Sequence, residues 1–556
     1  MTEPSPEAAY DYIVVGAGSA GCALVERLTR DGRTRVLLIE AGGSDRRFWI
    51  KVPVGYAINF ANPRLNWNYH AEPDAALAGR SLYWPRGKVI GGCSSINAMA
   101  YMRGLPQDFD DWAAMGADGW GWSEVGPAFD AMERRLERGV DGRPCERGAG
   151  PVAVSDLRDR MDGFSARFLD AAGECGWAQC DDLSATTAEG VGYYRSTVRR
   201  GLRWSAADAF LAPARRRGNL RVMTHATVER LTFDGARVRG LRLRTAAGPV
   251  ELTAGREVIL CAGAVNSPKL MQLSGIGPAE LLRGLGVPVR HDLPEVGRGL
   301  QDHLAISHVF RATVPTLNNV LGRPRARLMA GLHYLALRRG PLSVPVNQVG
   351  GYLRSDPALD RPDMQIYCNP LSYTAAPDGR PIPDRDPGYL LCAQPCRPTS
   401  RGTITIRSAD PDDPPVIRPN ALATERDRQE ARRAIALIAR LAAAPALAGV
   451  TQSRLMPPPE TCDPEALMAD FRARASTVFH PTSTCRMGAG PQSSVLDARL
   501  RVHGVPGLRV VDSSAFPAVT SGNTNAPTMM LATRAAEMIL EDAATATADT
   551  RRAHAS

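Results

Sequence analysis

The sequence is poor in lysine, which occurs only at positions 51, 88 and 269. The formal net charge of +9 therefore comes almost wholly from arginine. We interpret this as a compositional bias, because the densest basic run, residues 215–217, is most simply a solvated loop. No nucleic-acid partner is expected.

The eleven cysteines are an odd number, lie between Cys22 and Cys485, and include no CxxC pair. This pattern favours buried free thiols in a reducing compartment. Residues 1–9 carry no secretory signal, and the longest apolar stretch, 434–450, is interrupted by Arg440 and Pro445. We expect a cytoplasmic protein without a transmembrane segment. The sequence leaves open whether the protein makes weak peripheral contact with a membrane.

Metal-site and hydrolase patterns are missing as well. His303 and His308 are not at HExxH spacing and there is no Cys/His cluster, so no catalytic metal is expected. Ser94 and Ser95 lack the GxSxG context of a hydrolase nucleophile. With 556 residues, of which 44% are hydrophobic, the chain can bury a large core divided between two domains.

The first motif along the chain is a glycine-rich turn between an apolar run at 12–15 and a helical pattern at 22–28. The turn consists of Gly16, Ala17, Gly18, Ser19, Ala20 and Gly21. A second apolar run ends at Glu40, whose carboxylate could accept hydrogen bonds from both ribose hydroxyls and would repel a 2′-phosphate. The pattern predicts a βαβ dinucleotide site that excludes NADP and leaves NAD and FAD open.

Three further motifs follow in order along the chain. They are WPRGKVIGGCSSINA at 84–98, GAVNSP with LSGIGP at 263–278, and FHPTSTCRMG with SGNTNAP at 479–488 and 521–527. Together with the glycine turn, they resemble the signatures of the glucose-methanol-choline (GMC) oxidoreductases, all of which use FAD. The resemblance covers most of residues 10–542.

The resemblance implies an α/β fold with a Rossmann-like FAD-binding domain and a substrate domain that contains an antiparallel sheet. We expect residues 1–155, 198–306 and 466–545 in the first domain, 156–197 and 307–465 in the second, and a disordered tail at 546–556. Some relatives attach FAD through a histidine at the position of Ile96. An isoleucine has no nucleophilic nitrogen, so we expect FAD to be bound non-covalently.

The resemblance also implies a set of cofactor contacts. Val228 would contact the adenine end, Asp512 would lie near the pyrophosphate or ribityl chain, and Asn525 would bind through its backbone unless it is only a helix cap. The full expected set is Gly16, Ala17, Gly18, Ser19, Ala20, Gly21, Glu40, Ala41, Arg86, Val89, Gly92, Ser95, Asn97, Ala98, Met99, Ala100, Val228, Ala262, Asp512, Asn525 and Pro527.

His480 and Asn523 are the expected catalytic residues. Hydride transfer from an alcohol to flavin leaves a carbonyl, so the hydroxyl proton must depart, and an imidazole can accept it at neutral pH. Asn523 stands where many GMC relatives have a second histidine, and its amide can hold the substrate oxygen. We expect the other histidines to form no rival site.

The sequence leaves the substrate and the electron acceptor open. Residues 306–352 contain no Asp or Glu, which favours a neutral primary alcohol over choline. The acceptor could be a quinone, another carrier or oxygen, and a homodimer is possible. The alternatives are a choline dehydrogenase or alcohol oxidase of the same family, a hydroxynitrile-type lyase that keeps FAD, and a flavoprotein without redox activity.

Overall fold

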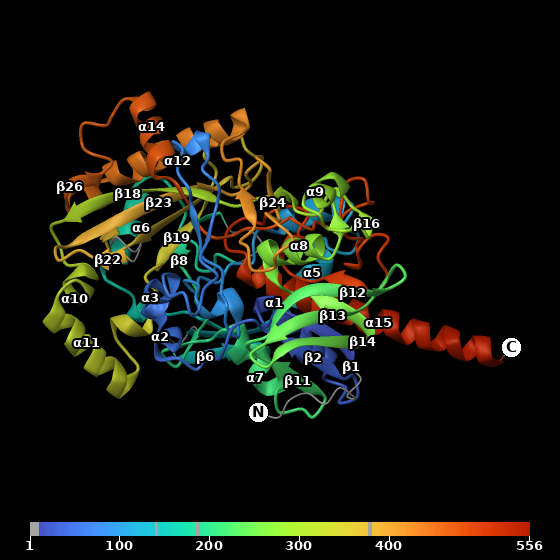
Figure 1. The fold of residues 1–556 in the computed structure, drawn as a ribbon. Helices are drawn as coiled ribbons and strands as arrows, with labels where there is room; N and C mark the ends of the chain where they lie inside the picture. The colour runs from blue at the N-terminus through green and yellow to red at the C-terminus, as the bar shows by residue number, and fades with distance from the viewer. Residues whose placement is uncertain (1–9, 139–142, 185–188, 376–380, 556) are drawn as a thin grey trace.

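The protein is described by a computed structural model over residues 10–138, 143–184, 189–375 and 381–555, and it is built around two large sheets (Figure 1). Residues 1–9, where no secretory signal is expected, and residue 556 lie outside this range. The eleven cysteines are all free thiols, as predicted, and seven of them are buried. The mixed α/β fold agrees with the expected class.

The first sheet has the strand order β11-β2-β1-β14-β13-β12, with β28 paired to the far side of β14. The bounds are β1 Tyr10–Val15, β2 Val36–Ile39, β11 Leu220–Met223, β12 Thr227–Asp234, β13 Arg237–Thr245, β14 Gly248–Leu260 and β28 Leu508–Val510. β11, β2, β1, the end of β14 and β28 are parallel, whereas β12, β13 and the start of β14 form an antiparallel meander. Parallel strands buried on both faces explain the continuous apolar runs.

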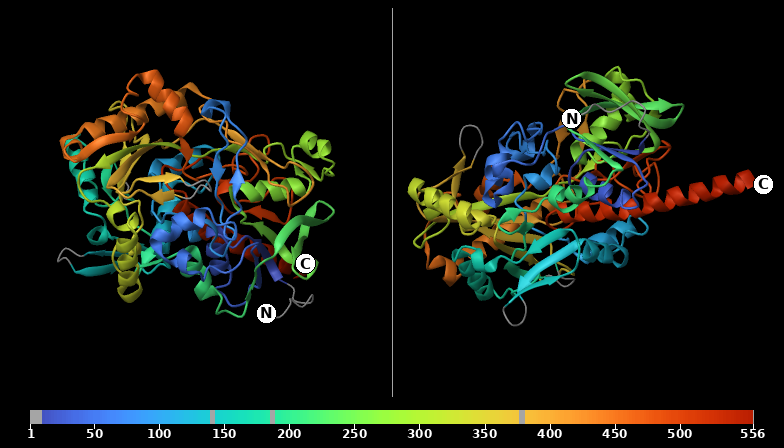
Figure 2. Two further views of the ribbon diagram at one scale, coloured as in Figure 1. Left: turned by 60° about the vertical axis from the view of Figure 1, so that its left-hand side comes forward. Right: turned by 90° about the horizontal axis from the view of Figure 1, so that it is seen from below.

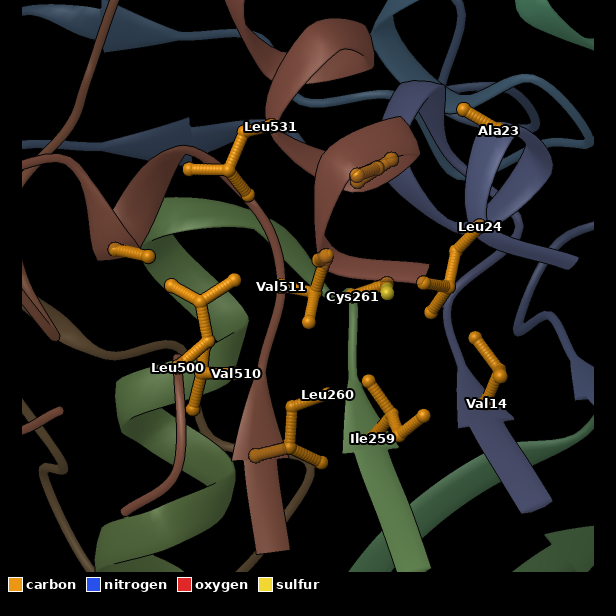
Figure 3. Packing of buried hydrophobic residues seen from close by; sticks show 14 of the residues in the cluster. Val14, Ala23, Leu24, Ile259, Leu260, Cys261, Leu500, Val510, Val511 and Leu531 are labelled. Carbon is orange, nitrogen blue, oxygen red and sulfur yellow. The ribbon is translucent and has the colours of Figure 1, made fainter. Parts of the chain in front are cut away.

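Helices α1 (Ser19–Leu28) and α15 (Asn525–Ala555) pack together against the parallel part of this sheet. Figure 3 shows the contact at close range, with Leu24 of α1 and Leu531 of α15 facing Val14 and Ile259 of the strands. The same core holds chain segments some 500 residues apart in sequence, because β28 and α15 return to the N-terminal βαβ unit.

The second sheet is antiparallel and has the order β26-β18-β23-β20-β19-β8, with the short β27 paired to β18. The bounds are β8 Gly190–Tyr193, β18 Leu304–Ala312, β19 Val349–Leu353, β20 Met364–Asn369, β23 Gly388–Pro395, β26 Thr451–Met456 and β27 Ser476–Thr477. Helices α6 (Phe164–Glu174) and α12 (Glu425–Ala443) cover one face and form the second core.

Smaller elements complete the molecule. A sheet of β5 (Glu133–Arg138), β6 (Pro144–Arg147) and β7 (Val152–Ser155) follows α4 (Pro106–Ala114) and α5 (Trp122–Met132). The other helices of eight or more residues are α8 (Gly263–Leu273), α11 (Pro324–Leu337) and α14 (Pro464–Arg474). Shorter elements used below are α2 (Phe48–Lys51), α3 (Tyr56–Phe60), α9 (Ala279–Gly284), α10 (Asn318–Leu321), β21 (Tyr373–Ala375) and β22 (Pro381–Pro383).

The prediction of a disordered tail at 546–556 is wrong over the described part, because α15 continues to Ala555 and projects away from the body (Figures 1 and 2). The Ala-rich composition of this segment favours a helix, since alanine has the highest helix propensity. No helix of the described chain is both long and apolar enough to cross a bilayer.

The two sheets lie in the segments assigned to the two expected domains, with two exceptions in the second sheet: β18 begins at Leu304, just before the expected boundary, and β27 lies within 466–545, a segment assigned to the first domain. The division into domains itself stays a prediction.

Candidate active site

A cavity of about 1260 Å³ is lined by residues of both sheets. On one side are the carboxyl ends of the parallel strands β1, β2, β14 and β28, with the first turns of α1, α8 and α15. In open parallel sheets, ligands bind at this edge. On the other side are residues of β18, β20 and β23, so the antiparallel sheet closes the cavity.

The glycine turn after β1 is shaped by close backbone contacts. Gly16 has a φ of +103°, and a Cβ atom there would lie 2.4 Å from the carbonyl oxygen of Cys261. A Cβ atom at Gly21 would lie 1.9 Å from the carbonyl oxygen of Gly16. Only glycine fits these two positions. The turn therefore brings the N-terminus of α1, with its unpaired backbone N–H groups, to the cavity.

Glu40 follows β2 and lies beside this turn, as the sequence predicted. Its buried carboxylate accepts hydrogen bonds from the backbone N–H groups of Ala17 (2.9 Å) and Gly42 (2.8 Å). Burial raises the pKa of Glu40 to about 7, although these two hydrogen bonds oppose the shift. The side chain lines the cavity, where a ligand hydroxyl could donate to its remaining lone pairs.

The glycine-serine loop lies directly against the first turn. Gly92 has a φ of +53°, and a Cβ atom there would approach the Cα atom of Gly18 to 2.7 Å. The side chain of Asn97 accepts hydrogen bonds from the backbone N–H of Met99 and from the buried guanidinium of Arg203. These hydrogen bonds fix the conformation of the loop, in which Asn97, Met99 and their neighbours line the cavity.

Asp512 and Asn525 link the C-terminal segments to the same region. The buried carboxylate of Asp512 accepts hydrogen bonds from the backbone N–H of Gly263 (2.8 Å) and from the hydroxyl of Ser267 (2.6 Å), at the start of α8. The side chain of Asn525 accepts a hydrogen bond from the hydroxyl of Ser19 (2.7 Å), which ties α15 to α1. Both residues line the cavity.

His480 and Asn523 meet where the two sheets face each other. The Nδ2 atom of Asn523 lies 3.1 Å from the Nε2 atom of His480. On its other side, the Nδ1 atom of His480 lies 3.0 Å from the Nδ1 atom of His303, and the Nε2 atom of His303 lies 2.8 Å from the carbonyl oxygen of Cys396. The four groups form one chain of hydrogen bonds.

This chain determines which nitrogens carry protons. A carbonyl oxygen can only accept, so the Nε2 atom of His303 must donate to Cys396. Burial lowers the pKa of His303 to about 4, which keeps its ring neutral and leaves its Nδ1 atom as an acceptor. His480 therefore donates from Nδ1, and its Nε2 atom is an unprotonated acceptor beside the amide of Asn523.

Burial also lowers the pKa of His480 well below its usual range, and His303 and Arg86 lower it further. The guanidinium of Arg86 donates to the carbonyl oxygen of Phe479 (2.7 Å), and the carboxylate of Asp302 accepts from the backbone N–H of His480 (2.8 Å). The backbone on both sides of the imidazole is thus fixed. The arrangement suits a neutral base at physiological pH.

Most of the expected site residues line the cavity. They are His480, Asn523, Gly16, Gly18, Ser19, Ala20, Glu40, Ala41, Arg86, Gly92, Asn97, Ala98, Met99, Ala100, Val228, Ala262, Asp512 and Asn525. Five expected cofactor residues, Ala17, Gly21, Val89, Ser95 and Pro527, are not in the lining. Two of them stabilise residues around the cavity through hydrogen bonds. The backbone N–H of Ala17 donates to the carboxylate of Glu40, and the hydroxyl of Ser95 donates to the carbonyl oxygen of Ile90.

His303 was not expected to take part in any site. No spacing rule connects residue 303 with residue 480. The one available signal was the run of three polar residues Gln301, Asp302 and His303 just before β18, because buried polar residues need partners. The sequence also did not predict that β20 and β23 form a wall of the cavity, which includes Gln365.

The residues present fit FAD. A Cβ atom at Gly92 would clash with Gly18, so the glycine-serine loop can lie against the glycine turn and leave backbone groups open to a pyrophosphate, and Glu40 offers a carboxylate for ribose hydroxyls. Ile96 is buried and apolar, which agrees with non-covalent binding. No group of three or more His, Cys, Asp or Glu side chains within the described ranges is placed to hold a metal ion.

Comparison with known proteins identifies the family. Family profiles described as GMC oxidoreductase match residues 10–305 and 398–532. The chain is 40% identical over 539 residues to mitochondrial choline dehydrogenase of Homo sapiens, covering 95% of this chain and 89% of that protein. It is 40% identical over 534 residues to alcohol dehydrogenase [acceptor] of Pseudomonas putida, covering 96% of each.

Among solved structures, pyridoxine 4-oxidase from Mesorbium loti matches with a TM-score of 0.84 and 32% identity, over 95% of this chain and 98% of that one. A cavity at the carboxyl edge of a parallel sheet, beside a glycine turn and Glu40, is typical of a dinucleotide-binding protein. The chain belongs to the GMC oxidoreductase family. It is an FAD-dependent enzyme of the kind that acts on CH–OH donors.

Proposed function

We propose that the protein oxidises a neutral alcohol to an aldehyde or ketone, with His480 as the general base and Asn523 as the residue that positions the substrate oxygen. The observation that supports this most directly is the unprotonated Nε2 atom of His480, 3.1 Å from the amide nitrogen of Asn523 in the wall of the cavity. FAD, when bound, supplies the hydride acceptor.

The roles of the two residues follow from their hydrogen-bonding capacity. A substrate hydroxyl placed between them would donate its proton to the Nε2 atom of His480 and accept from the amide of Asn523. As the proton moves to His480, the amide stabilises the negative charge that develops on the substrate oxygen. The ring of His480 cannot rotate freely, because its Nδ1–H is bound to His303.

The lining of the cavity favours a neutral substrate. Over the described residues, the only carboxylates that line it belong to Glu40 and Asp512, and both lie at the expected cofactor side. The opposite wall holds amide and aromatic side chains such as Gln365, Gln394 and Tyr367, and the lining includes the cations Arg327 and Arg474. A quaternary ammonium group gains most from a carboxylate or an aromatic cage, and this wall supplies aromatic rings but no carboxylate. The missing carboxylate and the two arginines favour a neutral alcohol over choline. One relative is named for choline and another for alcohol.

The proposal extends to the electron acceptor and to the cellular location of the protein. The electrons pass to a quinone or another carrier, with oxygen as the alternative acceptor. Eleven free thiols suit a reducing compartment, which supports a cytoplasmic location.

A lyase of the hydroxynitrile type is the second candidate function, because the same unprotonated imidazole could serve acid/base cleavage.

The test is anaerobic mixing of the purified flavoprotein with a panel of alcohols and choline while the flavin absorbance is followed. We expect bleaching with neutral alcohols and much slower bleaching with choline. If the flavin stays oxidised with every alcohol, the redox proposal is wrong and the lyase becomes the leading function. Admitting oxygen to the bleached enzyme then separates an oxidase, which recovers its colour rapidly, from a dehydrogenase.

A further inference from the structure

The exposed apolar side chains of this protein are concentrated around one part of its surface. Over the described residues, twelve large apolar side chains are exposed, and ten of them lie on α2–α3, α11 or the β21–β22 hairpin. These ten are Phe48, Trp49, Ile58, Leu328, Met329, Leu332, Leu335, Leu337, Tyr373 and Ile382. A clustered apolar surface of this kind marks an interaction site, whereas single exposed residues do not.

Each of the three segments also supplies residues to the wall of the active-site cavity. Trp49 and Ile58 come from the first segment, Arg327 and Gly331 from α11, and Ile382 from the hairpin. In Figure 1, α10 and α11 lie next to α2 and α3, on the side of the molecule opposite to the end of α15. The apolar surface therefore surrounds the cavity at its outer end.

Helix α11 shows the pattern most clearly. Its five large apolar residues are between 52% and 64% exposed, and Tyr334 is its one fully buried side chain. Leu328, Leu332 and Leu335 are spaced i, i+4 and i+7, which places them on one face, while Tyr334 anchors the other face through a hydrogen bond to the carbonyl oxygen of Gly201. A helix whose leucines face outward has its polarity inverted relative to a surface helix of a globular protein.

The ends of α11 are basic. Arg323, Arg325, Arg327, Arg338 and Arg339 are exposed, and none of them forms an ion pair with a carboxylate of the described chain. No Asp or Glu occurs from residue 306 to residue 352. Exposed apolar side chains next to clustered arginines combine the two contributions that bind proteins to the surface of anionic membranes, burial of apolar area and attraction of basic side chains.

We infer that this surface, defined by α2–α3, α11 and the β21–β22 hairpin, docks the enzyme onto an anionic phospholipid membrane. The leucines of α11 enter the boundary between headgroups and acyl chains, and the arginines contact phosphate groups. The cavity then opens toward the lipid, so apolar alcohols or a lipid-soluble acceptor reach it without crossing water.

A second copy of the chain is a poorer occupant. A two-fold interface places the same patch on both partners and would bring ten arginines of the two α11 helices into one interface, where 306–352 supplies no carboxylate and the segment after β22 supplies only Asp384 and Asp386. A lipid surface supplies the opposite charge along its whole area.

The experiment is co-sedimentation of the FAD-containing protein with vesicles of phosphatidylcholine alone or mixed with phosphatidylglycerol. We expect binding to the anionic vesicles that weakens with salt. The triple variant L328Q/L332Q/L335Q should lower the partition coefficient at least about tenfold. Replacing Arg325, Arg338 and Arg339 by Gln should lower binding to anionic vesicles about 100-fold at low salt, since each basic residue contributes about fivefold.

Two matched controls complete the design. M115Q/M456Q removes the two exposed apolar residues outside the surface, and R33Q/R239Q/R283Q changes the charge by the same amount at exposed positions elsewhere. Both should bind as the unaltered protein does. Flavin content and melting temperature show that each variant is folded.

The measurement does not depend on the proposed reaction, because it detects binding rather than turnover. Absence of vesicle binding, or equal binding by the leucine variant, overturns the inference. Sedimentation velocity without lipid distinguishes the alternative: a dimer that dissociates in the leucine variant would assign the surface to a second copy.

Discussion

The two ends of the cavity are built in different ways. The cofactor end is organised around one continuous βαβ unit, in which a strand, a turn and a helix follow each other within about thirty residues, and other segments are added to it. The catalytic end joins His303, Cys396, His480 and Asn523, which lie on four separate segments. The first end holds its ligand through backbone shape, whereas the second depends on a chain of hydrogen bonds between side chains. Substitutions at the two ends should therefore fail in different ways.

The largest effect is expected at the catalytic end. His480→Ala removes the proton acceptor and should slow flavin reduction by an alcohol about 100- to 10,000-fold while FAD stays bound. Rapid anaerobic mixing measures the rate, and the flavin spectrum measures the occupancy. His70→Gln, at an exposed histidine outside the cavity, is the control. Near-normal reduction in His480→Ala would remove this residue from its proposed role.

The cofactor end should fail by losing its ligand. Gly18 has extended backbone angles, and a Cβ atom there would meet nothing closer than the Cα atom of Gly92 at 3.9 Å, so Gly18→Val should fold. The added side chain fills the space that a pyrophosphate needs, and FAD affinity should fall about 100-fold, or about 2.7 kcal/mol.

Fluorescence titration of the apoprotein with FAD measures this loss of affinity. Gly163→Ala is the control, because a Cβ atom at that position has no neighbour within 4 Å. Unchanged FAD affinity in Gly18→Val would place the pyrophosphate elsewhere in the cavity.

His303 allows a finer test of the catalytic end. His303→Ala leaves the Nδ1 atom of His480 without its acceptor, so the imidazole can adopt the other tautomer and rotate. We expect flavin reduction to slow about 10- to 100-fold with FAD retained, and we expect His303→Asn to recover part of the rate through its side-chain oxygen. If both variants reduce as fast as the unaltered enzyme, His303 only fills space.

The two ends also differ in how far the sequence could reveal them. Spacing alone predicted that Gly16, Gly18 and Glu40 lie together at the end of the first two strands, where the structure has them, because their contacts are local and the turn requires glycine. His480 and Asn523 were found through a family resemblance, and His303 was missed, because its partner lies 177 residues away and their meeting depends on how β18 pairs in the second sheet.

The outward-facing leucines of α11 could not be recognised either, since the helix period shows which residues share a face but not which face is buried. The continuation of α15 to Ala555 was not predicted, since a disordered tail was expected from residue 546.

The smallest expected effect is a displaced pH profile. In the proposed reaction His480 works unprotonated, and its pKa is lowered well below the usual 6.5, first by burial and then by His303 and Arg86. The working form therefore persists as the pH falls through 6.5 and is lost only when the pH reaches the lowered pKa. Flavin reduction at saturating alcohol should stay nearly constant between about pH 8 and 6.5 and decline only in more acidic solution. An acidic limb centred at or above pH 6.5, with His70→Gln behaving identically, would mean that the proton acceptor is a more exposed group than His480. In that case the chain of hydrogen bonds through His303 would organise the cavity wall without taking part in the proton transfer.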